Sequence, residues 1–435
     1  MMRIGLVNHY AVPPTAAGGT RHWDLASEWD LAGHEVVLLA SSFNHFEQTS
    51  ESKLAPRTQM GQRSALVALG GRPYEGNGIG RALGMLEFAW RVLRSRGYLS
   101  GVDVVIGSSP HPFAAVAAAM VARIRRVPFV YEVRDLWPQT LVDMGAMPPG
   151  SFMTRLLYLM ERRTVRVASG LVYLPPEADR YFTEKGMELG RALHAPNSAP
   201  PFEGPKGQPA ARVGEVLTEV ENFQRSGVRV FCYAGTIGRA NGLGPVVDAF
   251  LDRRVRDRAA LVVCGDGPER AGLEARLPRD GNVIFAGHVS KSDAFRVVDG
   301  CDVALFHLLD APVFKYGLSP NKLVDYLSIG KPILYAGPSV PNPTTGSGAT
   351  IDAVPGVTSS MVDAVDTFIQ MDEAHLRVMA AKARRHASEH YSTSAVAERY
   401  AKFLDDVVSG ARRPAEARHS DTNRIMPAKK EAGSL

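Results

Sequence analysis

Residues 319–332 combine a helix signature with the side chains of a ligand site. The segment reads Ser-Pro-Asn-Lys-Leu-Val-Asp-Tyr-Leu-Ser-Ile-Gly-Lys-Pro. Serine is a frequent helix N-cap and proline suits the first helical position, so Ser319 and Pro320 predict a helix start. Gly330 and Pro332 predict its end.

Three polar residues of this helix share one face. Asn321, Lys322 and Asp325 are spaced i, i+1 and i+4, which brings them together on a helix. A helix N-terminus with a lysine in its first turn favours an anion such as a phosphate. The carboxylate one turn deeper can accept two hydrogen bonds from the diol of a ribose. The pattern indicates a nucleotide site, and the alternative is the solvated face of an amphipathic helix.

Two segments of the N-terminal half place informative residues where strands end. Gly18 and Gly19 lie between a strand and a helix, where glycine lets the backbone approach a phosphate or sugar; the alternative is a tight turn. Glu132, Arg134 and Asp135 end an apolar strand before Trp-Pro, which favours cleft-lining chemistry over a salt-bridged strand cap. Because no G-x-G-x-x-G motif is present, a dinucleotide site is not supported.

Glycine turns also follow two strands of the C-terminal half. Residues 234–242 contain three glycines, of which Gly238 precedes Arg239. This composition suggests a diphosphate held by backbone N–H groups and a guanidinium. Gly265 and Gly267 form a second turn that permits close approach of a ligand to the backbone.

The histidines and cysteines show no metal-ligand spacing. The residues concerned are His9, His111 and His288, and Cys232, Cys264 and Cys301. His111 lies between two prolines and either lines the cleft or caps the next helix. The cysteines are far apart in sequence and two lie in apolar runs, so we expect buried reduced thiols, no metal ion and no cofactor.

The 435-residue chain, 45% hydrophobic and 22% charged, has the size and composition of a soluble protein with two domains. Its net charge of +5 suits anionic small molecules or a membrane surface and does not demand nucleic acid. The N-terminus leads directly into a predicted strand, so we expect no signal peptide, and the sequence contains no apolar run of about 18 residues. We therefore expect a cytoplasmic protein, either free or peripheral at the cytoplasmic membrane.

Strand and helix patterns alternate along the chain, which predicts parallel sheets with helices on both faces. In the N-terminal half, strands are predicted at 4–8, 35–40, 102–106, 128–133 and 171–174, and helices at 20–32, 80–96, 112–125 and 152–168. In the C-terminal half, strands are predicted at 229–234, 260–264, 283–286, 303–306 and 333–335, and helices at 244–251, 269–277, 292–299 and 320–329. Residues 44–71 are polar and patternless and predict a mobile loop.

The predicted fold class is therefore α/β, with two Rossmann-like doubly wound domains that face each other across a cleft. The first domain comprises residues 1–204 together with a crossing C-terminal helix at 393–409, and the second comprises residues 205–392. The polar tail at 410–435 is expected to be disordered. Ligands of such folds bind at the carboxyl ends of the strands, which here face the cleft.

Two predicted helices of the first domain contain arginines among apolar residues. Arg91, Arg94 and Arg96 belong to the helix predicted at 80–96, and four more arginines to that at 152–168. Either helix could lie on an anionic membrane surface, and the alternative for each is a solvated face.

Taken together, these motifs resemble the family 4 glycosyltransferases. The branch that is most similar makes bacterial surface polysaccharides such as O-antigen and includes amino-sugar transferases such as N-acetylfucosaminyltransferases. The matching segments are 18–19, 33–36, 131–138, 195–197, 233–242, 265–268, 285–289 and 319–332. The resemblance implies the GT-B fold, in which the first domain faces the acceptor, the second binds most of the nucleotide-sugar donor, and a final helix returns to the first.

The resemblance also implies a chemistry and partners. The reaction would be a metal-independent, configuration-retaining transfer from a nucleotide sugar, preferably a UDP-sugar, to a glycan or polyprenyl-linked acceptor. The site would face the inner surface of the cytoplasmic membrane, in the synthesis of cell-surface polysaccharide or lipopolysaccharide. Cationic groups and helix N-termini would stabilise the departing diphosphate as the anomeric carbon becomes oxocarbenium-like, with no enzymic nucleophile.

The same resemblance implies roles for individual residues. Asp325 would bind the ribose, Lys322 the diphosphate, and one residue of the charged triplet the reacting sugar or acceptor. The implied substrate-binding residues are Gly18, Gly19, Gly238, Val289, Ser319, Asn321 and Asp325. The implied catalytic residues are Glu132, Arg134, Asp135, Arg239 and Lys322.

Two positions depart from the pattern of the family. Many members carry Glu eight residues before the ribose carboxylate, where this chain has Gly317, and the usual phosphate-binding Lys of the first loop is Asn241. We interpret Lys322 and Arg239 as supplying the missing charge. The alternatives are a nucleotide-sugar epimerase on the same fold, or a non-catalytic nucleotide- or glycan-binding protein, which the loss of Glu at 317 slightly favours.

Overall fold

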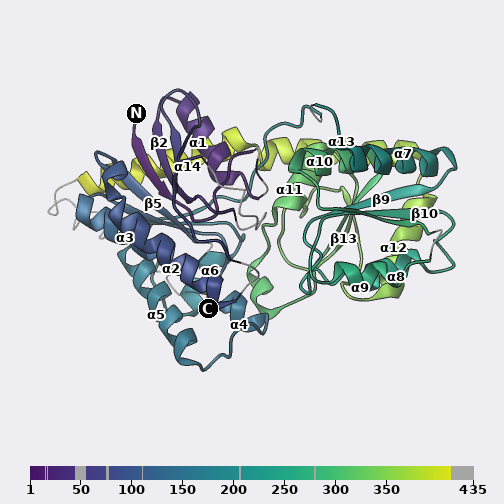
Figure 1. Ribbon diagram of the computed structural model, residues 1–435, viewed down its shortest axis with the longest axis horizontal. Helices are drawn as coiled ribbons and strands as arrows, with labels where there is room; N and C mark the ends of the chain where they lie inside the picture. Colours follow the sequence, from purple (N-terminus) through teal and green to yellow (C-terminus); the bar gives the residue numbers. More distant parts are fainter. Residues whose placement is uncertain are drawn as a thin grey trace, which may run out of the picture.

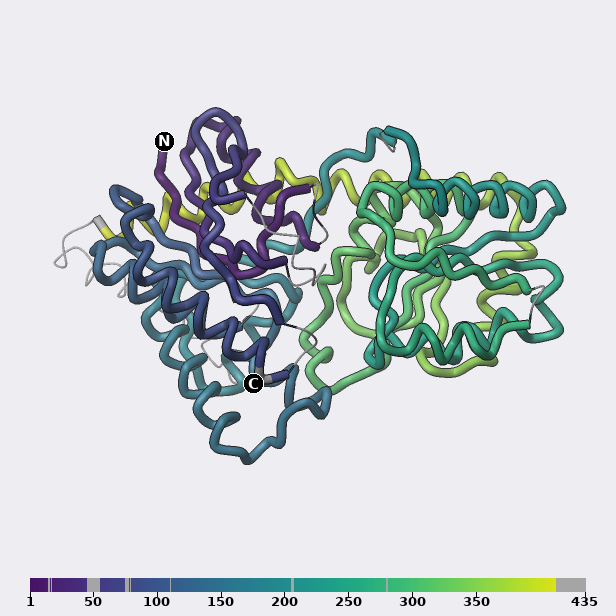
Figure 2. Tube along the Cα trace, viewed as in Figure 1, coloured from purple at the N-terminus to yellow at the C-terminus, as the bar shows by residue number. Residues whose placement is uncertain are grey.

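Two twisted sheets, each covered by helices on both faces, make up the computed structural model of the chain (Figure 1). The structure describes residues 1–14, 16, 18–44, 55–74, 78–109, 111–204, 207–278 and 281–412. The two α/β units lie side by side along the long axis, and the tube view shows a single return of the chain between them at its C-terminal end (Figure 2). The predicted α/β fold with two parallel-sheet domains is confirmed.

The first sheet has eight strands in the order β3-β4-β2-β1-β5-β6-β7-β8. They are β1 (Arg3–Val7), β2 (Glu35–Ser41), β3 (Arg57–Gln59), β4 (Ala65–Leu69), β5 (Val104–Ser109), β6 (Phe129–Val133), β7 (Gly170–Tyr173) and β8 (Ala192–His194). Every neighbouring pair is parallel except β3–β4. The inner strands are buried along most of their length because helices cover both faces.

Helices enclose this sheet in two layers. They are α1 (Arg21–Leu31), α2 (Ile79–Arg94), η1 (Arg96–Leu99), α3 (Pro112–Arg125), α4 (Gln139–Asp143), α5 (Phe152–Val167), α6 (Ala178–Glu184) and α14 (Thr393–Arg412). One core lies between the sheet and α2, α3 and α5, and a second lies between the sheet and the α1–α14 pair.

The second sheet has six parallel strands in the order β11-β10-β9-β12-β13-β14. They are β9 (Arg229–Ala234), β10 (Ala259–Cys264), β11 (Val283–Gly287), β12 (Val303–His307), β13 (Ile333–Ala336) and β14 (Thr350–Asp352). The helices are α7 (Ala211–Arg225), α8 (Gly244–Phe250), α9 (Arg270–Glu274), α10 (Lys291–Gly300), η2 (Pro312–Tyr316), α11 (Asn321–Ile329), α12 (Thr358–Gln370) and α13 (Glu373–His390). α7, α10, α11 and α13 pack on one face, and α8, α9 and α12 on the other.

The last helix, α14, returns to the first domain. The indole Nε1 of Trp29 in α1 donates to the Ala397 carbonyl at 2.8 Å, and the Trp29 and Tyr400 rings meet edge to face at 5.2 Å. The helix continues to Arg412, so residues 410–412 of the predicted tail are helical. The rest of that predicted tail lies outside the described residues, and the domain boundaries at 204 and 392 stay predictions.

Two predictions about local structure are wrong. The predicted loop at 44–71 contains β3 and β4: residues 65–69 are an apolar run, Ala-Leu-Val-Ala-Leu, that pairs with β2, and β3 pairs with β4 at the edge of the sheet. Residues 45–54 of the predicted loop lie outside the described residues. The second domain begins with α7, which the predicted series lacks together with α12 and α13. Within the described residues, no helix is both long enough and apolar enough to cross a bilayer.

Candidate functional site

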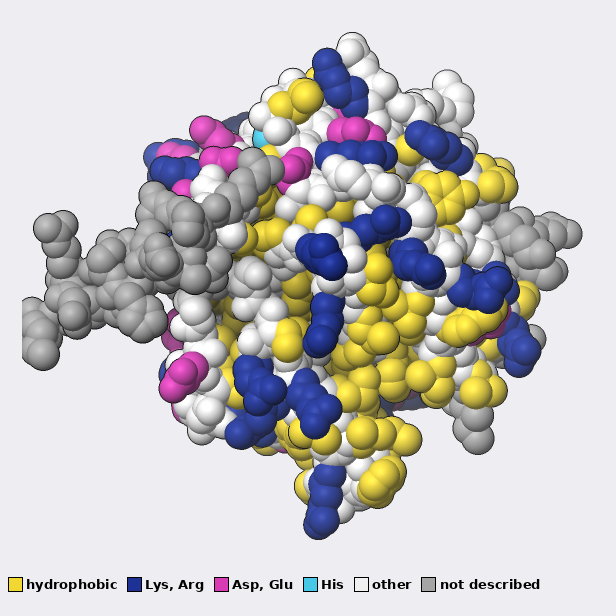
Figure 3. All heavy atoms as spheres, turned by 90° about the vertical axis from the view of Figure 1, so that its left-hand side faces the viewer, with side chains coloured by type: hydrophobic (Ala, Val, Ile, Leu, Met, Phe, Trp, Pro, Cys, Tyr) yellow, Lys and Arg dark blue, Asp and Glu magenta, His cyan; other side chains and the backbone are white. Residues whose placement is uncertain are grey.

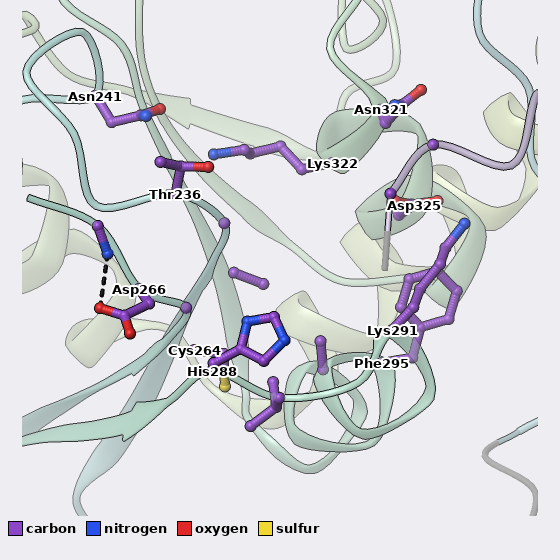
Figure 4. Close-up of a pocket in the computed structure, with 18 of the residues that line it drawn as sticks. Thr236, Asn241, Cys264, Asp266, His288, Lys291, Phe295, Asn321, Lys322 and Asp325 are labelled. Carbon is purple, nitrogen blue, oxygen red and sulfur yellow. Dashed lines mark hydrogen bonds between the residues drawn. The ribbon is translucent and has the colours of Figure 1, made fainter. Parts of the chain in front are cut away.

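A cleft of about 1330 Å³ lies where the carboxyl ends of both sheets face each other. From the first domain it is lined by Tyr10, Gly18, Gly19, Arg81, Arg134, Asp135 and Trp137. From the second it is lined mainly by Ala234, Gly235, Thr236, Asn241, Cys264, Gly265, Asp266, Gly267, Pro268, His288, Val289, Lys291, Phe295, Asn321, Lys322 and Asp325. Figure 4 shows that these side chains come from the two glycine turns, the start of α10 and the start of α11.

The helix predicted from residues 319–332 delivers three of these side chains. α11 begins one residue later than predicted, since Pro320 is the N-cap and Asn321 the first helical residue. Gly330 ends the helix in the left-handed conformation at φ +84°, as predicted. Asn321, Lys322 and Asp325 all line the cleft, so the polar face of α11 is turned into the site.

Lys322 lies over the aromatic floor of the cleft. Its Nζ donates to the Tyr233 hydroxyl at 2.9 Å and lies 4.3 Å from the centre of that ring. Burial lowers the pKa of Lys322 to about 7, because a desolvated ammonium is disfavoured. Gly235 makes room for it: a Cβ there would lie 2.6 Å from Nζ.

Asp325 is a carboxylate held in a partly dehydrated position. Burial raises the pKa of Asp325 to about 6, with the charge of Lys291 opposing the shift and that of Asp24 adding to it. An ionised carboxylate with few partners of its own is a strong acceptor for the two hydroxyls of a diol.

The two glycine turns of the second domain lie against each other. The N–H of Ile237 donates to the Asp266 carbonyl at 2.9 Å, and that of Gly235 to Cys264 at 2.8 Å. A Cβ at Gly265, where φ is +142°, would lie 1.9 Å from the Gly235 carbonyl oxygen. Glycine at 265 is therefore required by contact between the two turns as well as by its backbone conformation.

The first domain approaches the second at Gly19. A Cβ at Gly19 would lie 3.4 Å from Asn321 Nδ2 and 3.5 Å from a terminal nitrogen of Arg134. Burial raises the pKa of the Asp135 carboxyl, and the neighbouring Arg134 guanidinium opposes that shift. The glycine loop, the guanidinium and the amide of α11 thus meet in one narrow part of the cleft.

Glu132 lies beneath the cleft and does not line it. It is fully buried, and its carboxylate accepts from Arg21 at 3.2 Å, His22 at 2.6 Å and Ser108 at 2.9 Å. Burial alone would raise the pKa of Glu132, but the nearby Arg21 and His22 lower it. Of the predicted catalytic triplet, only Arg134 and Asp135 reach the cleft, because Glu132 is held by the start of α1.

Other predicted residues lie around the cleft with varied placements. Val289 is part of the lining, whereas Gly238, Arg239 and Ser319 are not. Arg239 is exposed. The Ser319 hydroxyl accepts from the backbone N–H of Asn197 at 3.2 Å, so it joins the two domains rather than capping α11.

His111 caps α3 and does not line the cleft. Its Nδ1 accepts from the Ala114 N–H at 3.4 Å, and its Nε2 lies 2.7 Å from His9 Nδ1. Burial lowers the pKa of His111 to about 3, so the ring is neutral. Of the two alternatives for this residue, the structure favours the cap.

The three cysteines are distant in sequence but meet in space. The neighbouring Cys264 and Cys301 thiols, together with burial, raise the pKa of the Cys232 thiol, and all three cysteines are free and buried. Among the described residues, no group of three or more His, Cys, Asp or Glu side chains could hold a metal ion.

Several lining residues were not predicted as site residues, among them Tyr10, Arg81, Trp137, Lys291 and Phe295. Trp137 was noted only as a neighbour of the charged triplet. Lys291 lies only two residues after Val289, so it could have been found by extending the segment that the resemblance implies for the base. Nothing local marks Tyr10 or Arg81, because they reach the cleft through tertiary packing.

Comparisons with known proteins agree with this fold. Residues 17–198 match the family model for a glycosyl transferase 4-like domain. Sucrose-phosphate synthase from Thermosynechococcus elongatus superposes with a TM-score of 0.71 at 14% identity, covering 94% of this chain and 100% of that chain. Anabaena Alr3699/HepE in complex with UDP and glucose superposes with a TM-score of 0.65 at 16% identity, covering 93% of this chain and 100% of that chain.

WaaG, a glycosyltransferase involved in lipopolysaccharide biosynthesis, superposes with a TM-score of 0.62 at 15% identity, covering 94% of this chain and 100% of that chain. No curated protein sequence matches. The chain therefore has the GT-B fold of two-domain glycosyltransferases. More particularly, most of its first domain matches a glycosyl transferase 4-like domain.

Proposed function

We propose that the protein is a family 4 glycosyltransferase that moves a sugar from a UDP-sugar to a glycan or lipid-linked acceptor, without a metal and with retention of configuration. The observation that carries the proposal is the polar face of α11. It turns Asn321, Lys322 and Asp325 into a cleft between two parallel-sheet domains, at the strand ends where ligands of this fold bind.

Each part of a nucleotide sugar has a suitable partner in the cleft. Asp325 can accept from the ribose diol, and Lys322 with the N-terminus of α11 can bind the diphosphate. The backbone around Val289, next to His288, also lines the cleft and suits the base. Anabaena HepE, which has the same fold, was crystallised with UDP-glucose, and this supports a UDP-sugar as the donor.

Contacts to the donor sugar must differ from those made by Glu in many family members. Gly317 has φ +87°, and a Cβ there would lie 2.7 Å from Pro176 Cδ and 2.9 Å from the Pro341 carbonyl. No side chain fits at that position, so we infer that Thr236 and Asn241, which line the cleft, bind the sugar hydroxyls or a 2-acetamido group.

The proposed chemistry relies on electrostatics. Lys322, the N-terminus of α11 and the first-domain glycine loop would stabilise the diphosphate as it leaves and the anomeric carbon becomes oxocarbenium-like. The acceptor hydroxyl attacks from the leaving-group face and passes its proton to a departing phosphate oxygen. Arg134 and Asp135 lie at the first-domain wall and would orient that hydroxyl.

We also propose that the acceptor is reached at an anionic membrane surface. α2, α3 and α5 form one layer on the first sheet. Exposed apolar side chains on this layer include Trp90 (55%), Ile124 (55%) and Phe152 (81%). Figure 3 shows apolar side chains at the centre of this end of the molecule with Lys and Arg side chains among them. Such a surface matches an anionic bilayer.

The transfer proposal is tested with a panel of nucleotide sugars, with and without lipid-linked and free glycan acceptors. We expect release of nucleoside diphosphate that depends on one donor and on an acceptor. An epimerase would convert the donor without release, and a binding protein would do neither.

The membrane proposal is tested separately by flotation of the protein with phosphatidylcholine vesicles that contain or lack phosphatidylglycerol. We expect binding only to the anionic vesicles, and weaker binding of Trp90→Ala and Phe152→Ala. If all of the protein stayed in the vesicle-free fraction with both kinds of vesicle, the membrane proposal would be contradicted.

A further inference from the structure

One lysine of the cleft joins the two domains directly. Lys291 is the first residue of α10, and its Nζ donates to the hydroxyl of Thr20 at 3.1 Å, from the second domain to the first. The aliphatic part of the side chain keeps the ammonium 5.3 Å from the centre of the Phe295 ring. Figure 4 shows Lys291 between that ring and Asp325.

Two carboxylates from opposite domains flank this ammonium. The Thr20 hydroxyl donates to Asp24 Oδ2 at 2.7 Å. The positive charge of Lys291 lowers the pKa of both Asp24 and Asp325, against the stronger effect of burial, while Asp24 raises that of Asp325. Without the lysine, two aspartates would face each other across the closed cleft with no charge between them, and like charges at short range repel.

Thr20 also connects the glycine loop to the first turn of α1. It is the N-cap residue of α1, yet its side chain makes no capping hydrogen bond. The hydroxyl is used instead by Lys291 and Asp24. The first N–H groups of α1 therefore stay without a side-chain cap, directly after Gly18 and Gly19, which face the cleft.

We propose that Lys291 is a positioning residue: with Thr20 and Asp24 it forms a latch at the ribose end of the cleft, which fixes the N-terminus of α1 over the bound donor. The inference rests on the proposed function for its effect on transfer, but the latch itself is a property of the ligand-free chain. Its loss should separate the domains and slow transfer while leaving nucleotide binding by the second domain almost intact.

The experiment compares Lys291→Met, Lys291→Arg and Thr20→Val with the wild type. Lys402→Met, an exposed lysine on α14, is the matched control. Spin labels on cysteines introduced at the exposed residues Leu31 and Val378 report the distance between the domains, since the native cysteines are buried. UDP affinity is measured by calorimetry and transfer by UDP release.

We expect Lys291→Met and Thr20→Val to broaden the distance distribution and to lower kcat about ten-fold, the effect of one lost charged hydrogen bond. UDP affinity should change less than about three-fold, Lys291→Arg should restore the wild-type distances, and Lys402→Met should behave as wild type. Unchanged distances in Lys291→Met and Thr20→Val would overturn the latch. So would a large loss of UDP affinity in Lys291→Met alone, because Lys291 would then be a donor ligand.

A failure of the proposed function looks different from a failure of the latch. If no nucleotide sugar supports transfer by the wild type, the function is wrong, and the spin-label distances still decide whether Lys291 holds the domains together.

Discussion

The charge on Lys322 should control nucleotide binding over the physiological pH range. Burial lowers the pKa of this lysine from its ordinary 10.5 to about 7. A diphosphate next to the ammonium favours the protonated form, so binding should raise that pKa and take up a proton. UDP affinity should therefore fall as the pH rises above 7, whereas an ordinary lysine would stay protonated and leave the affinity unchanged.

The size of the effect follows from the pKa. At pH 7 about half of the Lys322 side chains are protonated, and at pH 8 about one tenth are. If only the protonated form binds the diphosphate well, UDP affinity drops about five-fold between these two values. Binding at pH 8 should then take up close to one proton per UDP.

Calorimetry in buffers of different ionisation enthalpy measures both the affinity and the proton uptake. Lys322→Met removes the charge and keeps the length of the side chain. The terminal phosphate of UDP itself titrates near pH 6, but it does so equally with both proteins. The ratio of wild-type to variant affinity therefore isolates the lysine. A ratio that stays constant from pH 6 to pH 8, or the absence of proton uptake at pH 8, would refute the reasoning.

Two further predictions test other parts of the site. Asp325→Ala should lower transfer at least ten-fold, because a lost charged hydrogen bond costs about 1.5–3 kcal/mol; wild-type transfer kinetics would contradict the ribose assignment. Gly265→Ala should lower the free energy of unfolding by about 3 kcal/mol, since the added Cβ meets a carbonyl at 1.9 Å. Chemical denaturation measures this against Gly272→Ala, whose Cβ would have no atom within 4 Å, and equal stabilities would count against the clash.

The parts of the site that could be predicted from the sequence are those encoded locally. α11 carries its own start, its own glycine end and three polar residues at helical spacing, so its bounds were predicted to within one residue. The glycine turns at 235 and 265 were found for the same reason: each lies directly after a buried strand and has a positive φ.

The parts that could not be predicted depend on partners far away in the chain. From its place at a strand end, Glu132 was predicted to line the cleft. In the structure it is instead bound by Arg21 and His22, which lie more than 100 residues earlier in the chain. The bridge from Lys291 to Thr20 spans 271 residues, and no pattern in either segment indicates the other. The edge strand β3 was missed because its three residues owe their conformation to pairing with β4 and not to their own apolar pattern.

The cleft holds two ionisable groups, Lys322 and Asp325, whose charged forms are disfavoured by burial. Lys322 has a pKa below its ordinary value, so between about pH 7 and 10.5 the unfolded chain binds more protons at this site, and the fold is least favoured at the acid end of that window. Asp325 has a pKa raised to about 6, so its ionised form at pH 7 also costs the fold stability. A diphosphate would stabilise the ammonium and a diol would stabilise the carboxylate. A single nucleotide would thus relieve both costs, which an amphipathic helix with a merely solvated polar face would never incur.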